Sequence, residues 1–445
     1  MTPINYTKDE LFKLLNSALQ GHKTEYLSYL KDLVACDTRV VGHGIEGGYE
    51  KNGQEYLEKL LISLGAQVTK EIISEQAIQR SIKEHQEGNP GHNYMNGDRY
   101  NLIAKFKSSI SSRSLLFDGH IDTMPFGDIS QWKYAPLDMR LENGNLYGRG
   151  VSDMKSGLMA SIMAVKLIKD AGIDLPINIT ILSVIDEEGG GNGTLAAMLN
   201  GHRADAAVLC EPTDHSINIA HMGFIFFQID VEGKSLHSGK KWEGINAIEK
   251  AYILISALND LEHQWLMRYK HPFLPSPTLN VGVIEGGTAG STVPDKCTFK
   301  ICVHYLPGLM NYSQVVKEIN EAIYLRSDGD EWLKVHRPKI NIYQSGNAFE
   351  QDTSEEIVKT TAIAMKSVFR EAPLTGNPSG NDARLLKNIG KMPTIVAGPG
   401  TLDQCHTINE HIPEDDYYKF ILMYSILILQ WYTTNITNNK EIINK

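Results

Sequence analysis

SLLFDGHID (114–122), NITILSVIDEEGGG (178–191) and AAVLCEPT (206–213) are the segments that decide the fold of this chain. Each is a short apolar run, rich in Leu, Ile or Val, that breaks off at a His, an Asp or a Glu. Such runs predict buried strands, and MKSGLMASIMAVKLIKDAG (154–172) between the first two predicts a helix. Strands that alternate with helices predict an α/β fold with a mostly parallel sheet flanked by helices.

The segments outside this region fit the same layered architecture. Residues 8–35 have helical periodicity, and EYLEKLLISLG (55–65) predicts a second helix that ends at its glycine. NLIAKF (101–106) predicts another strand, whereas residues 84–99, rich in Gly and Asn, predict a polar surface loop. FILMYSILILQWY (420–432) predicts a buried helix, because spanning a membrane takes about 20 apolar residues.

The order of elements changes after residue 217. Six segments predict the order strand, helix, strand, strand, helix, strand: 224–233, 245–263, 278–287, 296–305, 312–326 and 338–344. This βαββαβ order is that of the ferredoxin-like unit. We therefore expect a small ferredoxin-like domain over residues 218–347, inserted into a catalytic domain formed by 1–217 and 348–445.

Composition and charge restrict the class of protein. The chain has 445 residues, of which 42% are hydrophobic and 22% are charged, as is typical of a globular protein with more than one domain. Its formal net charge of −10 argues against nucleic acid or an anionic membrane as a partner. Five cysteines without a CxxC pair, and a polar N-terminus, predict reduced thiols and a cytoplasmic location.

Five side chains of the metal-binding type stand where predicted strands give way to loops. They are His120, Asp153, Glu188, Glu211 and His406. The carboxyl ends of strands are where open α/β sheets bind ligands, so we expect these side chains to meet. Two imidazoles and three carboxylates, one of them shared, are a suitable set for two zinc ions.

Each of these positions also has a plainer interpretation. Asp153 precedes a predicted helix, where Asp is a frequent N-cap, and Glu211 is a strand-terminal acid before a proline. His406 adjoins Cys405, which is a candidate nucleophile or ligand, but adjacent side chains usually diverge, so we interpret Cys405 as a small core residue. The five residues together, each at such a junction, favour the metal centre over these alternatives.

Two further acids are candidates for catalytic roles. Asp122 lies two residues after His120 on an extended strand, where its carboxylate faces the same way and can accept the proton of the other ring nitrogen. Glu187 and Glu188 are adjacent, so one can ligate metal while the other takes a proton from the attacking water. The alternatives are a polar turn at Asp122 and a solvated acidic turn at 186–188.

Several blocks of this chain resemble the M20 family of metallopeptidases and deacylases, which includes acetylornithine deacetylase. The blocks span about 115–412: GHIDTMP, GRGVSDMKSG, DEEGGGNGT, CEPT, GKSLHSG, GNDAR and CHTINEHI. The resemblance implies that His120 and Glu211 hold one zinc, that Glu188 and His406 hold the other, and that Asp153 bridges them. It also implies Glu187 as general base, Asp122 as the residue that orients His120, and a cis peptide bond after Asp153.

The same resemblance assigns roles to the inserted domain. It implies a lid and dimerisation domain, whose His237 reaches the active site of the partner in a homodimer and stabilises the oxyanion. Ser291 and His304 stand where many relatives have Asn and Arg, which hold the substrate's carboxylate. A histidine is mostly neutral at pH 7, so recognition of a carboxylate is in question unless Arg384 of GNDAR, with Asn381, supplies it.

The expected activity is zinc-dependent hydrolysis of the amide bond of an N-acyl amino acid or a similar small amide. The cofactors are two zinc ions, with cobalt or manganese as alternatives for the same ligands. A dipeptidase or carboxypeptidase of the same family is the second hypothesis, and a non-catalytic binding protein on this fold is the third. The sequence leaves the acyl group and the amine portion of the substrate undetermined.

Overall fold

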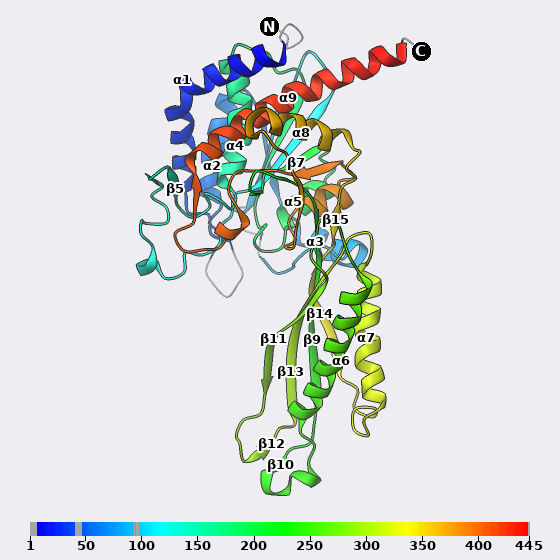
Figure 1. Cartoon of the computed structure of the whole chain (residues 1–445). Coiled ribbons are helices and arrows are strands. Elements are labelled where there is room, and N and C mark those ends of the chain that lie inside the picture. Colours follow the sequence, from blue (N-terminus) through cyan, green and yellow to red (C-terminus); the bar gives the residue numbers. More distant parts are fainter. Residues whose placement is uncertain (1–6, 41–46, 93, 95–97, 444–445) are drawn as a thin grey trace. The chain divides into compact units, whose positions relative to one another are not determined.

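The computed structural model describes residues 7–40, 47–92, 94 and 98–443, and the chain forms two compact units (Figure 1). Unit 1 consists of residues 1–219, 351–375 and 381–445, and unit 2 consists of 220–350 and 376–380. The segment 376–380 therefore belongs to unit 2, although the sequence predicts it for the other domain. The chain passes between the units within β8 (Ile217–His221), after β15 (Phe349–Glu350) and within β16 (Leu374–Asn377).

Unit 1 is built on an α/β sheet, as predicted. Its strands lie in the order β1 (Gln67–Ile72), β2 (Tyr100–Phe106), β6 (Asn178–Val184), β3 (Ser114–His120), β7 (Ala207–Leu209), β17 (Thr394–Val396) and β8. The central strands β6, β3, β7 and β17 are parallel, and β1, β2 and β8 are antiparallel to their neighbours at the edges. Parallel strands end at the same edge of the sheet, which brings the loops after β3, β6 and β7 together.

Helices cover this sheet. They are α1 (Lys8–Val34), α2 (Lys51–Ser63), α3 (Glu75–His85), α4 (Lys155–Asp170), α5 (Asn192–Leu199), α8 (Glu356–Phe369) and α9 (Glu414–Ile443). Helix α4 packs against β3, α1 and α9, and α5 packs against β2 and β6. Helix α9 is buried over residues 420–429, as its apolar sequence predicts, whereas β1 and α3 were not predicted. No described helix is long and apolar enough to cross a membrane.

Several short elements complete unit 1. β4 (Arg140–Glu142), β5 (Asn145–Tyr147) and β18 (His411–Pro413) form a three-stranded antiparallel sheet beside the loop that leads to α4. Single helical turns lie at Ile129–Gln131, Leu385–Ile389 and Leu402–Gln404.

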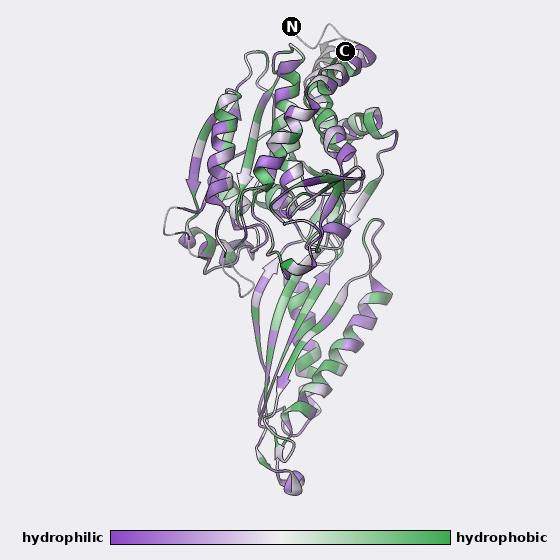
Figure 2. Cartoon of the chain, turned by 90° about the vertical axis from the view of Figure 1, so that its left-hand side faces the viewer, coloured by the Kyte–Doolittle hydropathy of each residue, from purple (hydrophilic) through white to green (hydrophobic). Residues whose placement is uncertain are grey.

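Unit 2 has the predicted ferredoxin-like topology. β9 (Gly223–Glu232), α6 (Ala247–Arg268), β11 (Thr278–Gly286), β13 (Lys296–Tyr305), α7 (Tyr312–Asp328) and β14 (Lys339–Gly346) form a sheet in the order β11-β13-β9-β14 with two helices. Alternate residues of β9 and β13 are buried with the apolar residues of α6 and α7 in one core. Figure 2 shows hydrophilic and hydrophobic residues mixed along the helices of both units, although α4 is buried along nearly its whole length. A two-stranded sheet of β10 (Leu236–His237) and β12 (Thr292–Val293), with a short turn at Ser238–Glu243, extends this unit.

Candidate metal centre

The sheet of unit 1 delivers three of the predicted ligands to one edge. β3 ends at His120, β6 leads into the turn that carries Glu188, and β7 leads to Glu211. His120 is paired in register with Val184 of β6, and β7 is parallel to β3 on the other side. The ligands therefore converge because neighbouring parallel strands end together, as the sequence predicts.

The structure brings all five predicted ligands into two groups that share one residue. His120 Nε2 lies 3.0 Å from Asp153 Oδ1 and 3.5 Å from Glu211 Oε1. His406 Nε2 lies 3.2 Å from Asp153 Oδ2 and 2.9 Å from Glu188 Oε2. Asp153 thus directs one carboxylate oxygen to each group, which is the division that the resemblance implies. The ligand atoms of each group lie within 4.8 Å of one another.

The electrostatics of the two groups fit divalent cations. Burial opposes ionisation of Asp153, yet the imidazoles of His120 and His406 hold the pKa of that carboxyl well below its usual range. The carboxylates of Asp153 and Glu188 raise the pKa of His406 to about 11, and burial raises the pKa of Glu211 to about 7. The raised pKa values of His406 and Glu211 favour bound protons at these ligands, which bound cations would replace.

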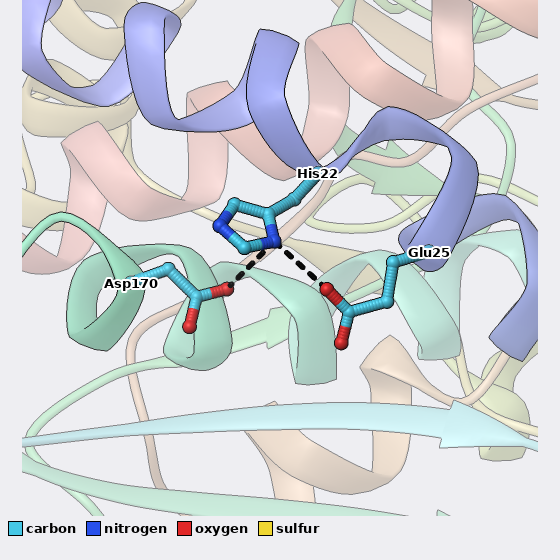
Figure 3. Close-up of side chains that lie close together, drawn as sticks. All are labelled: His22, Glu25 and Asp170. Carbon is cyan, nitrogen blue, oxygen red and sulfur yellow. Dashed lines mark hydrogen bonds and ion pairs between the residues drawn. The ribbon is translucent and has the colours of Figure 1, made fainter.

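A third group of metal-type side chains provides a contrast. His22 and Glu25 of α1 lie beside Asp170 at the end of α4 (Figure 3), with His22 Nδ1 2.8 Å from Glu25 Oε2. Here Lys166 Nζ lies 3.1 Å from Glu25 Oε1 and 2.8 Å from Asp170 Oδ2. Because Lys166 pairs with both carboxylates, we interpret this group as an ion-pair cluster between two helices.

Asp122 contacts the metal centre in a way that differs from the prediction. His120 Nδ1 lies 2.9 Å from the backbone carbonyl oxygen of Asp122, and 3.7 Å from its carboxylate. The carboxylate instead accepts hydrogen bonds from the backbone N–H groups of Glu187 (3.3 Å) and Glu188 (3.1 Å). The backbone of Asp122 therefore orients His120, and its side chain holds the turn that carries Glu188.

Glu187 lies beside the ligands without belonging to either group. Burial, together with the nearby carboxylate of Asp382, raises the pKa of Glu187 well above its ordinary value. A carboxyl group with a raised pKa can hold and release a proton near neutral pH. Asp382 is itself buried, and the sequence carried no signal for its effect on Glu187 beyond its place in GNDAR.

Asp186, the first acid of the 186–188 turn, is neutralised by residues that the sequence assigns to a surface loop. Arg99 Nη2 lies 3.0 Å and His92 Nδ1 2.9 Å from Asp186 Oδ1, and the hydroxyl of Tyr94 donates to the same carboxylate. Glu87, Tyr94 and Arg99 are buried, so the predicted surface position is wrong for these three residues, whereas Glu84, Pro90, Gly91 and Asp98 are exposed as predicted. Glu87 pairs with Arg384, and Tyr94 and Arg99 pair with Asp186.

Arg384 is buried in an ion pair rather than available to a substrate. Its Nε donates to Glu87 Oε2 at 3.0 Å, its Nη1 to the carbonyl oxygen of Asn381 at 2.6 Å, and its Nη2 to that of Gly190 at 3.2 Å. Asn381 is buried as well, and its Oδ1 accepts from the N–H of Ala383 at 3.1 Å. This pairing argues against Arg384 as the cation that receives a substrate carboxylate.

The predicted site residues of unit 2, which are His237, Ser291 and His304, lie in two separate places. His237 and Ser291 are exposed neighbours, since β10 pairs with β12 and Ser238 N–H donates to the carbonyl oxygen of Ser291 at 2.8 Å. This pair of strands adjoins the Lys296 end of β13, whereas His304 lies near the other end. At about 3.4 Å per residue, the span from Lys296 to His304 is about 27 Å. Within one unit 2, therefore, His237 and His304 do not meet.

Three features that the sequence predicts or the resemblance implies lie close to this site, together with one residue that was not predicted. The Asp153–Met154 peptide bond is cis. Helix α4 begins at Lys155 with Met154 at its N-cap, so Asp153 is not the cap. Cys405 is half-buried, and its Sγ lies 3.7 Å from the carbonyl oxygen of Thr401. Glu410, which no sequence pattern singled out, lies behind Asp153 and accepts from its backbone N–H.

Comparison with known proteins places this site in a family context. Residues 116–430 match the model of Peptidase family M20/M25/M40. A deformylase of N-formyl-4-amino-5-aminomethyl-2-methylpyrimidine from Bacillus subtilis is 32% identical over 355 residues, covering 74% of this chain and 83% of that protein. An acetylornithine deacetylase from Proteus mirabilis is 30% identical, covering 71% of this chain and 78% of that protein.

Solved structures agree with this match at the level of the fold. An M20 family metallo-carboxypeptidase from Sulfolobus solfataricus aligns with a TM-score of 0.73 at 20% identity, covering 92% of this chain and 99% of that one.

Proposed function

The chain belongs to peptidase family M20/M25/M40, a family of hydrolases that act on C–N bonds, and from this premise we propose that it is a metal-dependent deacylase of small N-acyl amines. The observation that carries the proposal is the shared carboxylate of Asp153, with one oxygen at each of two His-containing ligand groups. Water and the amide are converted to a carboxylate and a free amine.

Two zinc ions are the proposed cofactors, with cobalt or manganese as alternatives for the same ligands. His120, Asp153 and Glu211 hold one ion, and Asp153, Glu188 and His406 hold the other. Bound cations of this kind supply Lewis acidity toward the amide carbonyl and the attacking water.

Glu187 is the proposed general base and acid. It takes the proton of the attacking water and then gives it to the nitrogen of the leaving amine, so that the C–N bond breaks. Its half-buried position near the carboxylate of Asp382 supports this role, because the raised pKa favours a carboxyl that returns the proton it takes.

A homodimer with His237 of the partner subunit at the active site is part of the proposal, and there that imidazole stabilises the oxyanion. The separation of His237 and His304 along β13 supports it, since both meet one substrate only if they come from two subunits. β11 is an edge strand with half-exposed Val283 and Ile284, which suits contact with a second copy.

The five cysteines are free thiols, which supports a cytoplasmic location.

The proposed substrates carry a short acyl group on an amine without an α-carboxylate. Burial lowers the pKa of His304, so this side chain is neutral at pH 7 where many relatives carry a fixed charge. Arg384 is engaged by Glu87. The more similar of the two relatives above acts on a formylated aminomethylpyrimidine by its name, which also supports a substrate without a carboxylate.

The test is release of amine by the zinc-loaded protein from three substrates, with and without a chelator. The substrates are the N-formyl aminomethylpyrimidine, N-acetylornithine and a dipeptide. Chelator-sensitive release that is fastest from the first substrate supports the proposal. Preference for N-acetylornithine overturns the substrate class, and release from the dipeptide alone makes the protein a dipeptidase. A protein that binds two zinc ions and releases no amine contradicts the proposed activity.

A further inference from the structure

Glu410 is a fully buried carboxylate that binds the turn before α4 from behind. Its Oε1 accepts hydrogen bonds from the backbone N–H groups of Ser152 (2.7 Å) and Asp153 (3.1 Å). Its Oε2 accepts from the N–H of Gly150 (2.9 Å) and from Nη1 of Arg149 (3.0 Å). Four donors of one short turn therefore converge on a single side chain.

The backbone repeats this connection. The N–H of Gly148 donates to the carbonyl oxygen of Glu410 at 3.0 Å, and β18, which follows Glu410, is antiparallel to β5, which precedes the turn. Both the backbone and the side chain of Glu410 therefore bind the 145–153 segment. Buried N–H groups need acceptors, so this turn depends on the carboxylate for its conformation.

Glu410 also belongs to the segment that carries a ligand. It lies four residues after His406, and the backbone of His406 and of Asn409 both have a φ of 62°. The side chains of His406 and Asp153, which these two segments carry, also approach one another to 3.2 Å. One carboxylate therefore joins the turn that presents Asp153 to the turn that presents His406.

We propose that Glu410 is a positioning residue for the metal centre, which fixes the Asp153 turn against the His406 turn and so sets the geometry of the group formed by Asp153, Glu188 and His406. This inference rests on the proposed metal-dependent function. Glu410 itself is directed away from the ligand atoms, because its carboxylate oxygens contact backbone N–H groups and Arg149.

The test is the substitution Glu410→Gln, because an amide retains the size of the side chain but presents an NH2 donor to N–H donors. Glu87→Gln is the matched control: Glu87, like Glu410, is fully buried and paired with a buried arginine. Zinc affinity is measured by titration of the chelator-treated proteins against a chromophoric competitor, so the readout does not depend on turnover.

The wild-type protein is expected to bind two equivalents of zinc. In Glu410→Gln at least one equivalent is expected to bind tenfold or more weakly, while Glu87→Gln retains both affinities within about threefold, a difference well below the 1.4 kcal/mol of a tenfold change. Unchanged affinities in Glu410→Gln, or an equal loss in Glu87→Gln, overturn the role of Glu410. Failure of the wild-type protein to bind two equivalents overturns the proposed metal centre itself, which is a different result.

If Glu410→Gln does not fold, Arg149→Gln takes its place. This variant removes one of the four donors to Glu410 and leaves the three backbone N–H groups bound. Weaker binding of one zinc equivalent relative to Glu87→Gln supports the proposal, and wild-type affinity for both overturns it.

Discussion

The carboxylate of Asp122 accepts a hydrogen bond from the backbone N–H of Glu188 at 3.1 Å. The loop that follows His120 thereby holds the turn that carries Glu188, which belongs to the other ligand group. Glu410 makes the corresponding connection between the His406 turn and the Asp153 turn. The Glu188 turn and the Asp153 turn are thus each fixed by a carboxylate from another segment.

Asp122→Ala distinguishes the observed role of this side chain from the implied one. The substitution leaves the partly buried N–H groups of Glu187 and Glu188 without this acceptor, at a cost of at most about 1–3 kcal/mol for each. We expect weaker zinc binding at the group that contains Glu188, measured by zinc titration, and a lower free energy of unfolding. Loss confined to the group that contains His120 would instead favour orientation of that imidazole by the carboxylate.

Glu187→Gln is expected to keep two zinc equivalents and the wild-type fold but to lose turnover by about 100-fold or more, since general acid–base catalysis contributes about 10²–10⁴-fold. The measurement is kcat on the best amide substrate, with zinc content determined on the same sample. Near-normal turnover in this variant would remove Glu187 from its proposed role.

Asp153→Asn is expected to weaken both zinc equivalents, because one carboxylate oxygen belongs to each group. His406→Ala is the comparison, and it should weaken one equivalent only, since His406 contacts Asp153 and Glu188 but not Glu211. If the two variants bind the same number of zinc ions with the same affinities, the shared position of Asp153 is contradicted.

His304→Arg is expected to raise kcat/KM for N-acyl amino acids relative to amides without a carboxylate, by about tenfold. Arginine offers a permanent charge and a bidentate fork, which a neutral imidazole does not. The exposed His263 of α6 provides the control substitution His263→Arg, which adds the same charge elsewhere in unit 2. If the ratio of kcat/KM for N-acyl amino acids to kcat/KM for amides without a carboxylate is unchanged, His304 has no role in substrate recognition.

The ion pair of His215 with Asp416 makes a contribution to stability that depends on pH. Its Nε2 lies 2.7 Å from Asp416 Oδ1, and the bond to this carboxylate raises the pKa of His215 above its ordinary value. Because the folded-state pKa is raised, the contribution is fully present below the unfolded pKa of about 6.5 and is lost as pH rises through the folded pKa.

Thermal unfolding of the wild type and of Asp416→Asn tests this sign. The difference in Tm is expected to be largest at about pH 6 and to shrink toward about pH 9. The double variant His215→Gln with Asp416→Asn should show no such trend relative to His215→Gln. A Tm difference that grows with pH would contradict the assignment.

The architecture of both units followed from local pattern. The apolar runs before His120, Glu188 and Glu211 contain the strands β3, β6 and β7. These strands could be predicted because an apolar run and its break depend only on residues that are neighbours in the chain. The βαββαβ order of unit 2 was likewise readable from successive periodicities. β1 and α3 were missed because QVTKEI and EQAIQRSIKEH are largely polar and exposed, so the pattern of buried residues is weak.

The burial of polar residues between 84 and 99 did not follow from pattern. Residues 84–99 are polar in sequence, yet Glu87 is fully buried because it pairs with Arg384. This partner is 297 positions away in the chain, so no local pattern reveals it. The same holds for Arg99 with Asp186, which are 87 positions apart. Polar composition predicts exposure only when no distant partner is available, and the sequence does not show which partners meet.

By itself the sequence indicated the five candidate ligands and that three of them, His120, Glu188 and Glu211, follow neighbouring strands, because strand ends and their polar residues are encoded locally. Only the tertiary structure decided how Asp153 divides its two oxygens between His120 and His406, and which carboxylates hold the turns. Those relationships depend on the packing of segments such as 150–153 and 410, which are separated by about 260 residues and are brought together by burial and hydrogen bonding rather than by sequence order.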